Sequence, residues 1–236
     1  MSKKLFQYES IQAGYYDYIF HKKKGIRSAW HHAKFKFVKE NIDQKNIHLD
    51  IACGPGTFLS LLNNKKSFGV DISKSQINYA QKKYGSKKKK FIVLKKKLPF
   101  KKNSLDSISL IELIEHLPLK KIQKILDDAF YCLKKNGEIY ITTPNYLSLW
   151  PILEIILNLI SSVSYEDQHI TKFNKFNIKK IVDRKKFKII SIKSFILLGP
   201  FLSFFSFNFY KKFSFIDKIL TYIFPGNLIF LKIKKL

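Results

Sequence analysis

The stretch Leu49-Asp50-Ile51-Ala52-Cys53-Gly54-Pro55-Gly56-Thr57 decides the fold class of this chain. An apolar run ends in a tight loop with two glycines, and a helix-like pattern starts at Phe58. Glycines let backbone N–H groups and a helix N-terminus approach a ligand closely. The stretch therefore predicts the strand–loop–helix start of a nucleotide-type α/β site. A Gly-x-Gly alone is a weak signal, so the prediction depends on the residues at fixed distances downstream.

Alternating strand and helix patterns come after the loop. Apolar runs predict five strands, at residues 47–52, 67–71, 91–94, 105–111 and 138–143. Helical patterns begin near Ser73, a suitable N-cap, and after Pro118, which suits a first helical turn. This alternation predicts a doubly wound, mostly parallel α/β sheet with helices on both faces. Ligands are expected at the carboxyl ends of its strands.

The regions on either side of these elements are predicted separately. Residues 1–45 form an aromatic-rich helical segment, either packed on the sheet edge or closing as a lid over a substrate pocket. Residues 46–236 form the main domain, with apolar cap elements at about 146–170 and 195–225. Further elements are predicted by local pattern: helices at 150–160 and 173–185, and strands at 187–192 and 228–233.

The composition limits the classes of partner. The net charge is +27, which indicates nucleic acid, an anionic membrane or a compositional bias towards lysine. Arg27 and Arg184 are the only arginines, although arginine is the usual residue for bidentate phosphate and base contacts. This favours the bias over nucleic acid. The two cysteines, Cys53 and Cys132, exclude a disulfide framework and suit a cytoplasmic location.

Asp71 gives the glycine loop a more specific meaning. It ends the predicted second strand, about twenty residues after the loop, where a dinucleotide-type site places an acid for ribose hydroxyls. An aspartate at the end of a strand is often only a turn residue. Its spacing from the loop favours a role in ribose binding.

Four ordered motifs together resemble the class I S-adenosylmethionine-dependent methyltransferases. The resemblance covers residues 47–193, and it is closest to small-molecule methyltransferases of the ubiquinone and menaquinone pathways. It implies a Rossmann-like sheet of seven strands with an antiparallel last strand. The motifs are LDIACGPGTFL, the acid in FGVDIS, LPFKKNSLDSISLIELIEHLP and LKKNGEIYITTPN.

The resemblance also implies a cofactor site for S-adenosylmethionine. Asp71 would hold the ribose. The other implied cofactor-binding residues, around the methionine and sulfonium groups or at the end of the fourth strand, are Asp50, Ala52, Gly54, Gly56 and Ile111. Two positions depart from the family pattern. Ala52 replaces the usual first glycine, and the acid that often binds adenine after the third strand is replaced by Leu94 and three lysines.

The turn after the fourth strand carries the candidate catalytic residues, Glu112 and His116. Methyl transfer to a hydroxyl benefits from a general base or a metal. Glu112, Glu115, His116 and the distant His169 resemble the divalent-metal site of ubiquinone-pathway O-methyltransferases and of small-RNA 2′-O-methyltransferases. Such ligands suit Mg²⁺, Mn²⁺ or Zn²⁺. The alternative is a Glu-His-Leu-Pro turn that only starts a helix, as in many relatives without metal.

Three functions remain open from the sequence. The leading one is an S-adenosylmethionine-dependent methyltransferase acting on a small or lipid-like acceptor. The others are a metal-assisted RNA 2′-O-methyltransferase and a non-catalytic protein that keeps the fold. The aromatic segment 195–215 and its flanking lysines suit peripheral contact with a membrane or a lipidic substrate, or else an ordinary packed cap.

Overall fold

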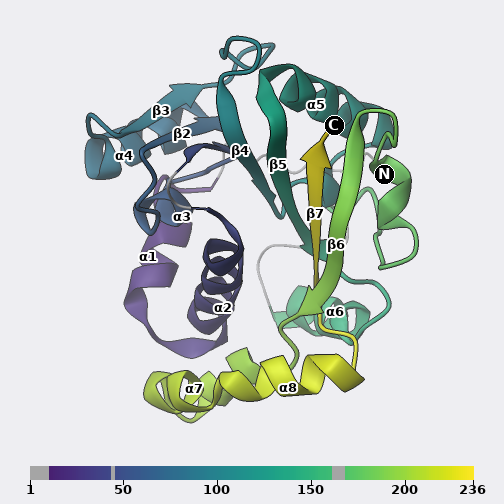
Figure 1. Ribbon diagram of the computed structural model, residues 1–236. Helices are drawn as coiled ribbons and strands as arrows, with labels where there is room; N and C mark the ends of the chain where they lie inside the picture. Colours follow the sequence, from purple (N-terminus) through teal and green to yellow (C-terminus); the bar gives the residue numbers. More distant parts are fainter. Residues whose placement is uncertain (1–10, 44–45, 161–167) are drawn as a thin grey trace, which may run out of the picture.

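A single seven-stranded sheet forms the centre of the molecule, in the order β3-β2-β1-β4-β5-β7-β6 (Figure 1). The computed structural model describes residues 11–43, 46–160 and 168–236, so the segment 1–45 and the cap 146–170 fall only partly within the described residues. The strands are β1 (Ile47–Ile51), β2 (Lys66–Asp71), β3 (Lys89–Val93), β4 (Leu105–Ile111), β5 (Leu133–Pro144), β6 (Phe187–Phe195) and β7 (Leu228–Lys235).

The direction of the strands confirms the predicted fold class. β1 to β5 pair in parallel, whereas β7 lies between β5 and β6 and is antiparallel to both. The carboxyl ends of β1 to β6 therefore lie at one edge of the twisted sheet, and β4, β5 and β6 run down to this edge in Figure 1. This is the Rossmann-like sheet with an antiparallel last strand that the sequence predicts.

Helices cover both faces of the sheet, and two apolar cores result. The helices are α1 (Tyr15–Lys22), α2 (Gly25–Asn41), α3 (Thr57–Ser60), α4 (Lys74–Tyr84), α5 (Leu119–Cys132), α6 (Trp150–Ile160), α7 (Phe207–Phe213) and α8 (Phe215–Ile223). One core joins the sheet to α5, and the other joins it to α2, α3 and α4. Along β7, Ile229 and Leu231 enter the first core while Leu228 and Phe230 enter the second, because strand side chains alternate.

One predicted element is wrong. The predicted helix at 173–185 is a series of turns with one short 3₁₀ helix, Ile178–Ile181. The Asn174 side chain accepts hydrogen bonds from the N–H groups of Phe176 and Asn177, both at 2.9 Å. Asparagine side chains of this kind compete with the helical hydrogen bonds of the backbone. The apolar spacing of the segment serves instead to pack Ile178 and Ile181 against the sheet.

Most other predicted boundaries lie within about three residues of the structure, but β5 begins at Leu133 and not at the predicted residue 138. Ser73 caps α4 by accepting a hydrogen bond from the N–H of Gln76, and α5 begins directly after Pro118. The connection from β3 to β4, residues 94–104, is described throughout and contains no helix. A face of the sheet beside α5 is therefore less covered at this point.

Candidate active site

The glycine loop makes a sharp turn at the carboxyl end of β1. Ala52, Gly54 and Gly56 all have positive φ angles, of 59°, 51° and 77°. Glycine is required at position 56 both by this backbone angle and by space, since an added Cβ would lie 2.6 Å from the Phe91 ring. Alanine in this left-handed region carries a strain of about 1 kcal/mol, so Ala52 stands where glycine is easier to accommodate. The loop brings its backbone close to the edge of the sheet where a ligand would lie.

Asp71 joins two loops at this edge. Its carboxylate accepts hydrogen bonds from the N–H of Gly54 and the N–H of Ser73, each at 2.9 Å. The first bond comes from the loop after β1, and the second from the start of α4. The side chain is buried. A single carboxylate thus sets the separation of the two loops that border the predicted cofactor site.

Asp50 lies inside the sheet next to this loop. Ser109 on β4 donates a hydrogen bond to its carboxylate over 2.5 Å, and the His48 ring lies between the hydroxyls of Ser107 and Ser109 at 2.8 and 2.9 Å. Burial raises the pKa of Asp50 to about 7, although the Ser109 hydrogen bond opposes the shift. Burial also lowers the pKa of His48 to about 3, so this histidine is neutral. The polar chain therefore carries at most one charge, on Asp50.

Asp17 on α1 is a site residue that the sequence patterns did not indicate. It is fully buried and accepts hydrogen bonds from Thr57 Oγ1 at 2.7 Å, Tyr79 at 2.8 Å, Tyr84 at 2.6 Å and Lys83 Nζ at 2.6 Å. Burial alone would raise the pKa of Asp17, but these donors, Lys83 first, lower it below its ordinary value. Asp17 therefore links α1 to Thr57, the first residue of α3 after the glycine loop. The only sequence signal was a lone acid within an aromatic run.

Glu112 follows β4 and meets the helix α2. Its φ angle is 50°, and its carboxylate forms an ion pair with the buried Lys34 and accepts a hydrogen bond from Trp30 Nε1 at 3.4 Å. Burial acts to raise the pKa of Glu112, but the charge of Lys34 lowers it below the ordinary value. The Glu112 carboxylate is thus ionised and paired with the Lys34 ammonium group, which makes it a weak proton acceptor in this state. Ile111, the last residue of β4, immediately precedes it.

Three of the four predicted metal ligands come together. One ligand atom from each of Glu115, His116 and His169 lies within 4.8 Å of the others. His116 Nδ1 is 2.9 Å from the Gln168 carbonyl, and His169 Nδ1 is 2.5 Å from Glu154. Histidine ligands commonly have one ring nitrogen held in this way while the other binds the metal.

Burial favours the neutral forms of Glu115 and His116 in this cluster. Burial, helped by the charge of nearby Glu112, raises the pKa of Glu115 to about 8, and Thr143 donates a hydrogen bond to this carboxyl group at 3.0 Å. Burial lowers the pKa of His116, which is therefore neutral near pH 7. Glu112, the fourth predicted ligand, does not belong to the cluster because Lys34 holds its carboxylate.

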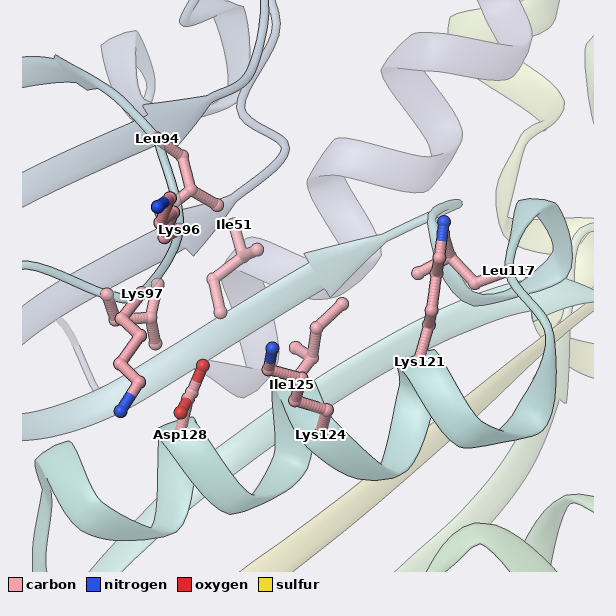
Figure 2. A pocket seen from close by; sticks show the side chains of 10 residues that line it. Ile51, Leu94, Lys96, Lys97, Leu117, Lys121, Lys124, Ile125 and Asp128 are labelled. Atoms are coloured by element: carbon pink, nitrogen blue, oxygen red, sulfur yellow. The ribbon is translucent and has the colours of Figure 1, made fainter.

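A hollow of about 220 Å³ lies between the connection after β3 and helix α5 (Figure 2). It occupies the region where the β3–β4 connection lacks a helix. Its floor is apolar, formed by residues that include Ile51 and Leu94, and lysines surround its mouth. Lys96 and Lys97, at the positions where the resemblance predicts an acid, form one wall of this hollow. The N–H of Leu94 donates a hydrogen bond to the Asp71 carbonyl at 2.7 Å.

Comparisons with known proteins agree with this geometry. A family model described as a methyltransferase domain matches residues 24–192, so the chain belongs to that family. An uncharacterized protein of Methanocaldococcus jannaschii is 30% identical over 181 residues, covering 74% of this chain and 67% of the relative. The chain is therefore a member of a methyltransferase-domain family and has the fold of class I S-adenosylmethionine-dependent methyltransferases.

Solved structures share the fold at low sequence identity. A methyltransferase of Aquifex aeolicus matches with a TM-score of 0.58 and 14% identity, over 94% of this chain and 98% of its own. Magnesium protoporphyrin IX methyltransferase of Synechocystis, solved with bound S-adenosylhomocysteine, matches with a TM-score of 0.62 and 14% identity, over 94% and 93%. These similarities establish the fold and leave the acceptor open.

Replacing Asp17 by alanine will destabilise the protein by about 2 kcal/mol, because four donors, among them the buried Thr57 hydroxyl, lose their acceptor. The urea midpoint of unfolding measures this loss. The control is Asp127→Ala, which removes the exposed ion pair with Lys186 and should cost less than about 1 kcal/mol. Equal midpoints for the two variants would contradict the anchoring role of Asp17.

Proposed function

We propose that this protein is an active S-adenosylmethionine-dependent methyltransferase that acts on a small or lipid-like acceptor. The observation that carries the proposal is the arrangement around Asp71, where one buried carboxylate is held by the loops after β1 and β2. That arrangement leaves the carboxyl edge bordered by the backbone of Gly54 and Gly56, by Asp71 and by Asp50. An amino-acid and sulfonium group suits such an edge better than a pyrophosphate, which uses a third glycine where Leu59 stands.

Each residue at the edge has a proposed task. Asp71 accepts hydrogen bonds from the ribose hydroxyls, Asp50 lies near the cationic methionine end, and the loop from Ala52 to Gly56 allows close approach of the backbone. Ile111 borders the cofactor at the end of β4. When bound, S-adenosylmethionine supplies an already activated methyl group, so positioning the acceptor supplies much of the remaining catalysis.

His116 is the proposed proton acceptor if the methyl group goes to a hydroxyl. It is neutral near pH 7 because burial lowers its pKa, and its Nδ1 is held by the Gln168 carbonyl. Glu112 serves differently, since its ionised carboxylate is paired with Lys34. We assign Glu112 to the orientation of Lys34 and Trp30 beside the acceptor. An amine or thiol acceptor would need no base beyond its own lone pair.

A metal-assisted O-methyltransferase, including one that acts on RNA, is the second candidate. The clustering of Glu115, His116 and His169 favours it, and these residues would hold the ion and let it lower the pKa of an acceptor hydroxyl. The ion pair between Glu112 and Lys34 opposes a four-ligand site. The third candidate, a non-catalytic protein with this fold, is decided by whether the cofactor binds.

Substituting Asp71 by asparagine will weaken S-adenosylmethionine binding by about 100-fold, since hydrogen bonds to a charged acceptor are lost. Isothermal titration calorimetry measures the change. Asp127→Asn, on the exposed side of α5, is the control with the same change of charge and should bind as the unmodified protein does. No binding by the unmodified protein would favour the non-catalytic alternative.

Cofactor binding will become tighter as pH rises from about 6 to about 8. The pKa of Asp50 is about 7 in the free protein, and a nearby cation lowers it. Binding therefore favours the deprotonated carboxyl and releases part of a proton near neutrality. Calorimetry in buffers of different ionisation enthalpy measures that proton. Asp50→Asn should remove the release, and its persistence in this variant would assign it to another group.

The metal hypothesis predicts a divalent ion bound at about one per chain, with Glu115 and the two histidines as ligands. Elemental analysis of the purified protein, followed by titration with Mg²⁺, Mn²⁺ or Zn²⁺ after chelation, measures it. His169→Ala should lower the affinity at least about tenfold, whereas His21→Ala, at an exposed position on α1, should not. Unchanged affinity in His169→Ala, or full activity after exhaustive chelation, would exclude this site.

A further inference from the structure

Helix α8 presents its apolar side to solvent. Phe215, Ile216, Ile219, Tyr222 and Ile223 follow helical spacing and form one stripe along the helix. A surface helix normally turns such a stripe towards the core. In α8 the whole stripe is exposed, with Tyr222 at 85% and Ile223 at 74%, and no residue of this fully described helix is buried.

The exposed apolar area continues beyond α8. Phe204 and Phe205, in the 3₁₀ helix Gly199–Phe204 and just after it, are 82% and 75% exposed. Phe209 on α7 and Phe224 after α8 are exposed as well. We call this set, together with the α8 stripe, the α7–α8 patch. Monomeric proteins seldom expose so many large apolar side chains together unless the area binds something.

Positive charge accompanies the patch. Lys211 and Lys212 on α7 and Lys218 on α8 are exposed. Burial is the main cause of the lowered pKa of His32, and the charges of Lys23 and Lys211 lower it further. Lys23, in the turn between α1 and α2, is therefore close to the same part of the surface as Lys211. Asp217, the one acid between residues 195 and 225, points inward and accepts hydrogen bonds from the N–H groups of Leu198 and Gly199 at 2.8 and 2.7 Å.

The patch lies at the same edge of the sheet as the candidate active site. The segment that carries it leaves β6 at Phe195 and enters β7 at Leu228, so it projects from the carboxyl edge, where Figure 1 shows α7 and α8 in line along the lower side. The Phe207 ring on α7 is 5.0 Å from the His32 ring on α2. Helix α2 also carries Trp30 and Lys34, which contact Glu112.

We propose that the α7–α8 patch binds the surface of an anionic lipid bilayer, with the apolar stripe of α8 inserted at the level of the headgroups. Exposed aromatic and aliphatic side chains with lysines beside them are what interfacial binding requires. A second copy of the chain is a poorer occupant, since each copy carries a net charge of +27 and two copies repel. Within the described residues, no helix has the length and apolar character to cross a bilayer.

Contact with a bilayer would also narrow the chemical class of the methyl acceptor, a step that rests on the proposed function. A protein held with the carboxyl edge of its sheet against a bilayer can take an acceptor directly from the lipid phase. Trp30 and Trp150, whose rings lie 5.5 Å apart, would contact such an acceptor on its way to Glu112. The acceptor would accordingly be an amphipathic or lipid-anchored molecule.

Flotation with vesicles tests the surface without any cofactor or acceptor. The full chain should bind phosphatidylcholine vesicles that contain phosphatidylglycerol, and bind less to pure phosphatidylcholine or at high salt. The double variant Ile219→Ser, Ile223→Ser should lower the partition coefficient at least about tenfold. Its control, Tyr131→Ser with Ile190→Ser, removes two exposed apolar side chains from other surfaces and should bind normally. All four positions are exposed, so an unchanged melting temperature is expected.

A pair of charge variants separates attraction of anionic vesicles to the α7–α8 patch from attraction to the positive charge of the whole protein. Lys211→Glu with Lys212→Glu should weaken binding to anionic vesicles by about fivefold or more for each lysine. Lys87→Glu with Lys88→Glu makes the same change of net charge at exposed positions before β3 and should have a smaller effect. Equal effects of the two charge variants, or no binding by the unmodified protein at low salt, would overturn the proposal.

Two further measurements distinguish the remaining outcomes. A concentration-dependent dimer in light scattering that the α8 variant abolishes, without vesicle binding, would assign the patch to a second copy and overturn the membrane inference. Calorimetry with S-adenosylmethionine on the same α8 variant should give unchanged affinity. Vesicle binding without cofactor binding would reject the proposed function and support the membrane surface. Cofactor binding without vesicle binding would support the proposed function and overturn the membrane surface.

Discussion

The burial of carboxylates at the carboxyl edge of the sheet is the constraint on which the site depends. A buried carboxylate must be paired, hydrogen-bonded or protonated, because leaving its charge without compensation in a low dielectric is costly. Asp17 and Asp71 receive several donors, and Glu112 receives the charge of Lys34. Asp50 and Glu115 follow the other course, since burial raises their pKa values to about 7 and about 8.

The two groups of buried acids at this edge have different roles. The paired acids fix structure: Asp71 sets the two loops, Asp17 holds α1, and Glu112 holds α2. The acids with raised pKa values are instead able to change charge near neutral pH when a cation arrives. Groups whose pKa values are moved towards neutrality in this way are common at functional sites. The charge state of this edge would therefore respond to what binds there.

The helices before β1 complete the site. Lys34 and Trp30 on α2 contact the carboxylate after β4, and Asp17 on α1 contacts the start of α3. These contacts make the described part of the N-terminal segment a wall of the site. At the other end of the chain, α7 and α8 reach the same region through the Phe207 contact with His32. The candidate site is thus bordered by elements from both ends of the chain, and its glycine loop, Asp71 and Asp50 come from β1, β2 and the loop after β1.

The sequence by itself determined the sheet and the position of the glycine loop and Asp71 at its carboxyl edge. Strand patterns, the glycine loop and Asp71 depend on contacts local to one β–α unit or on a repeated register, so their spacing along the chain is informative. Even here the helix predicted at 173–185 was wrong, because Asn174 holds the backbone in turns.

Only the tertiary structure decided which charges meet and which apolar face is left uncovered. Lys34 and Glu112 are 78 residues apart, and Asp17 and Lys83 are 66 apart, so no local pattern links them. The same holds for α8, which the sequence indicated only as part of an apolar cap at about 195–225 and whose apolar stripe faces outward in the structure. Spacing along a helix shows that a stripe exists, while the packing of distant elements decides whether it faces the core or the solvent.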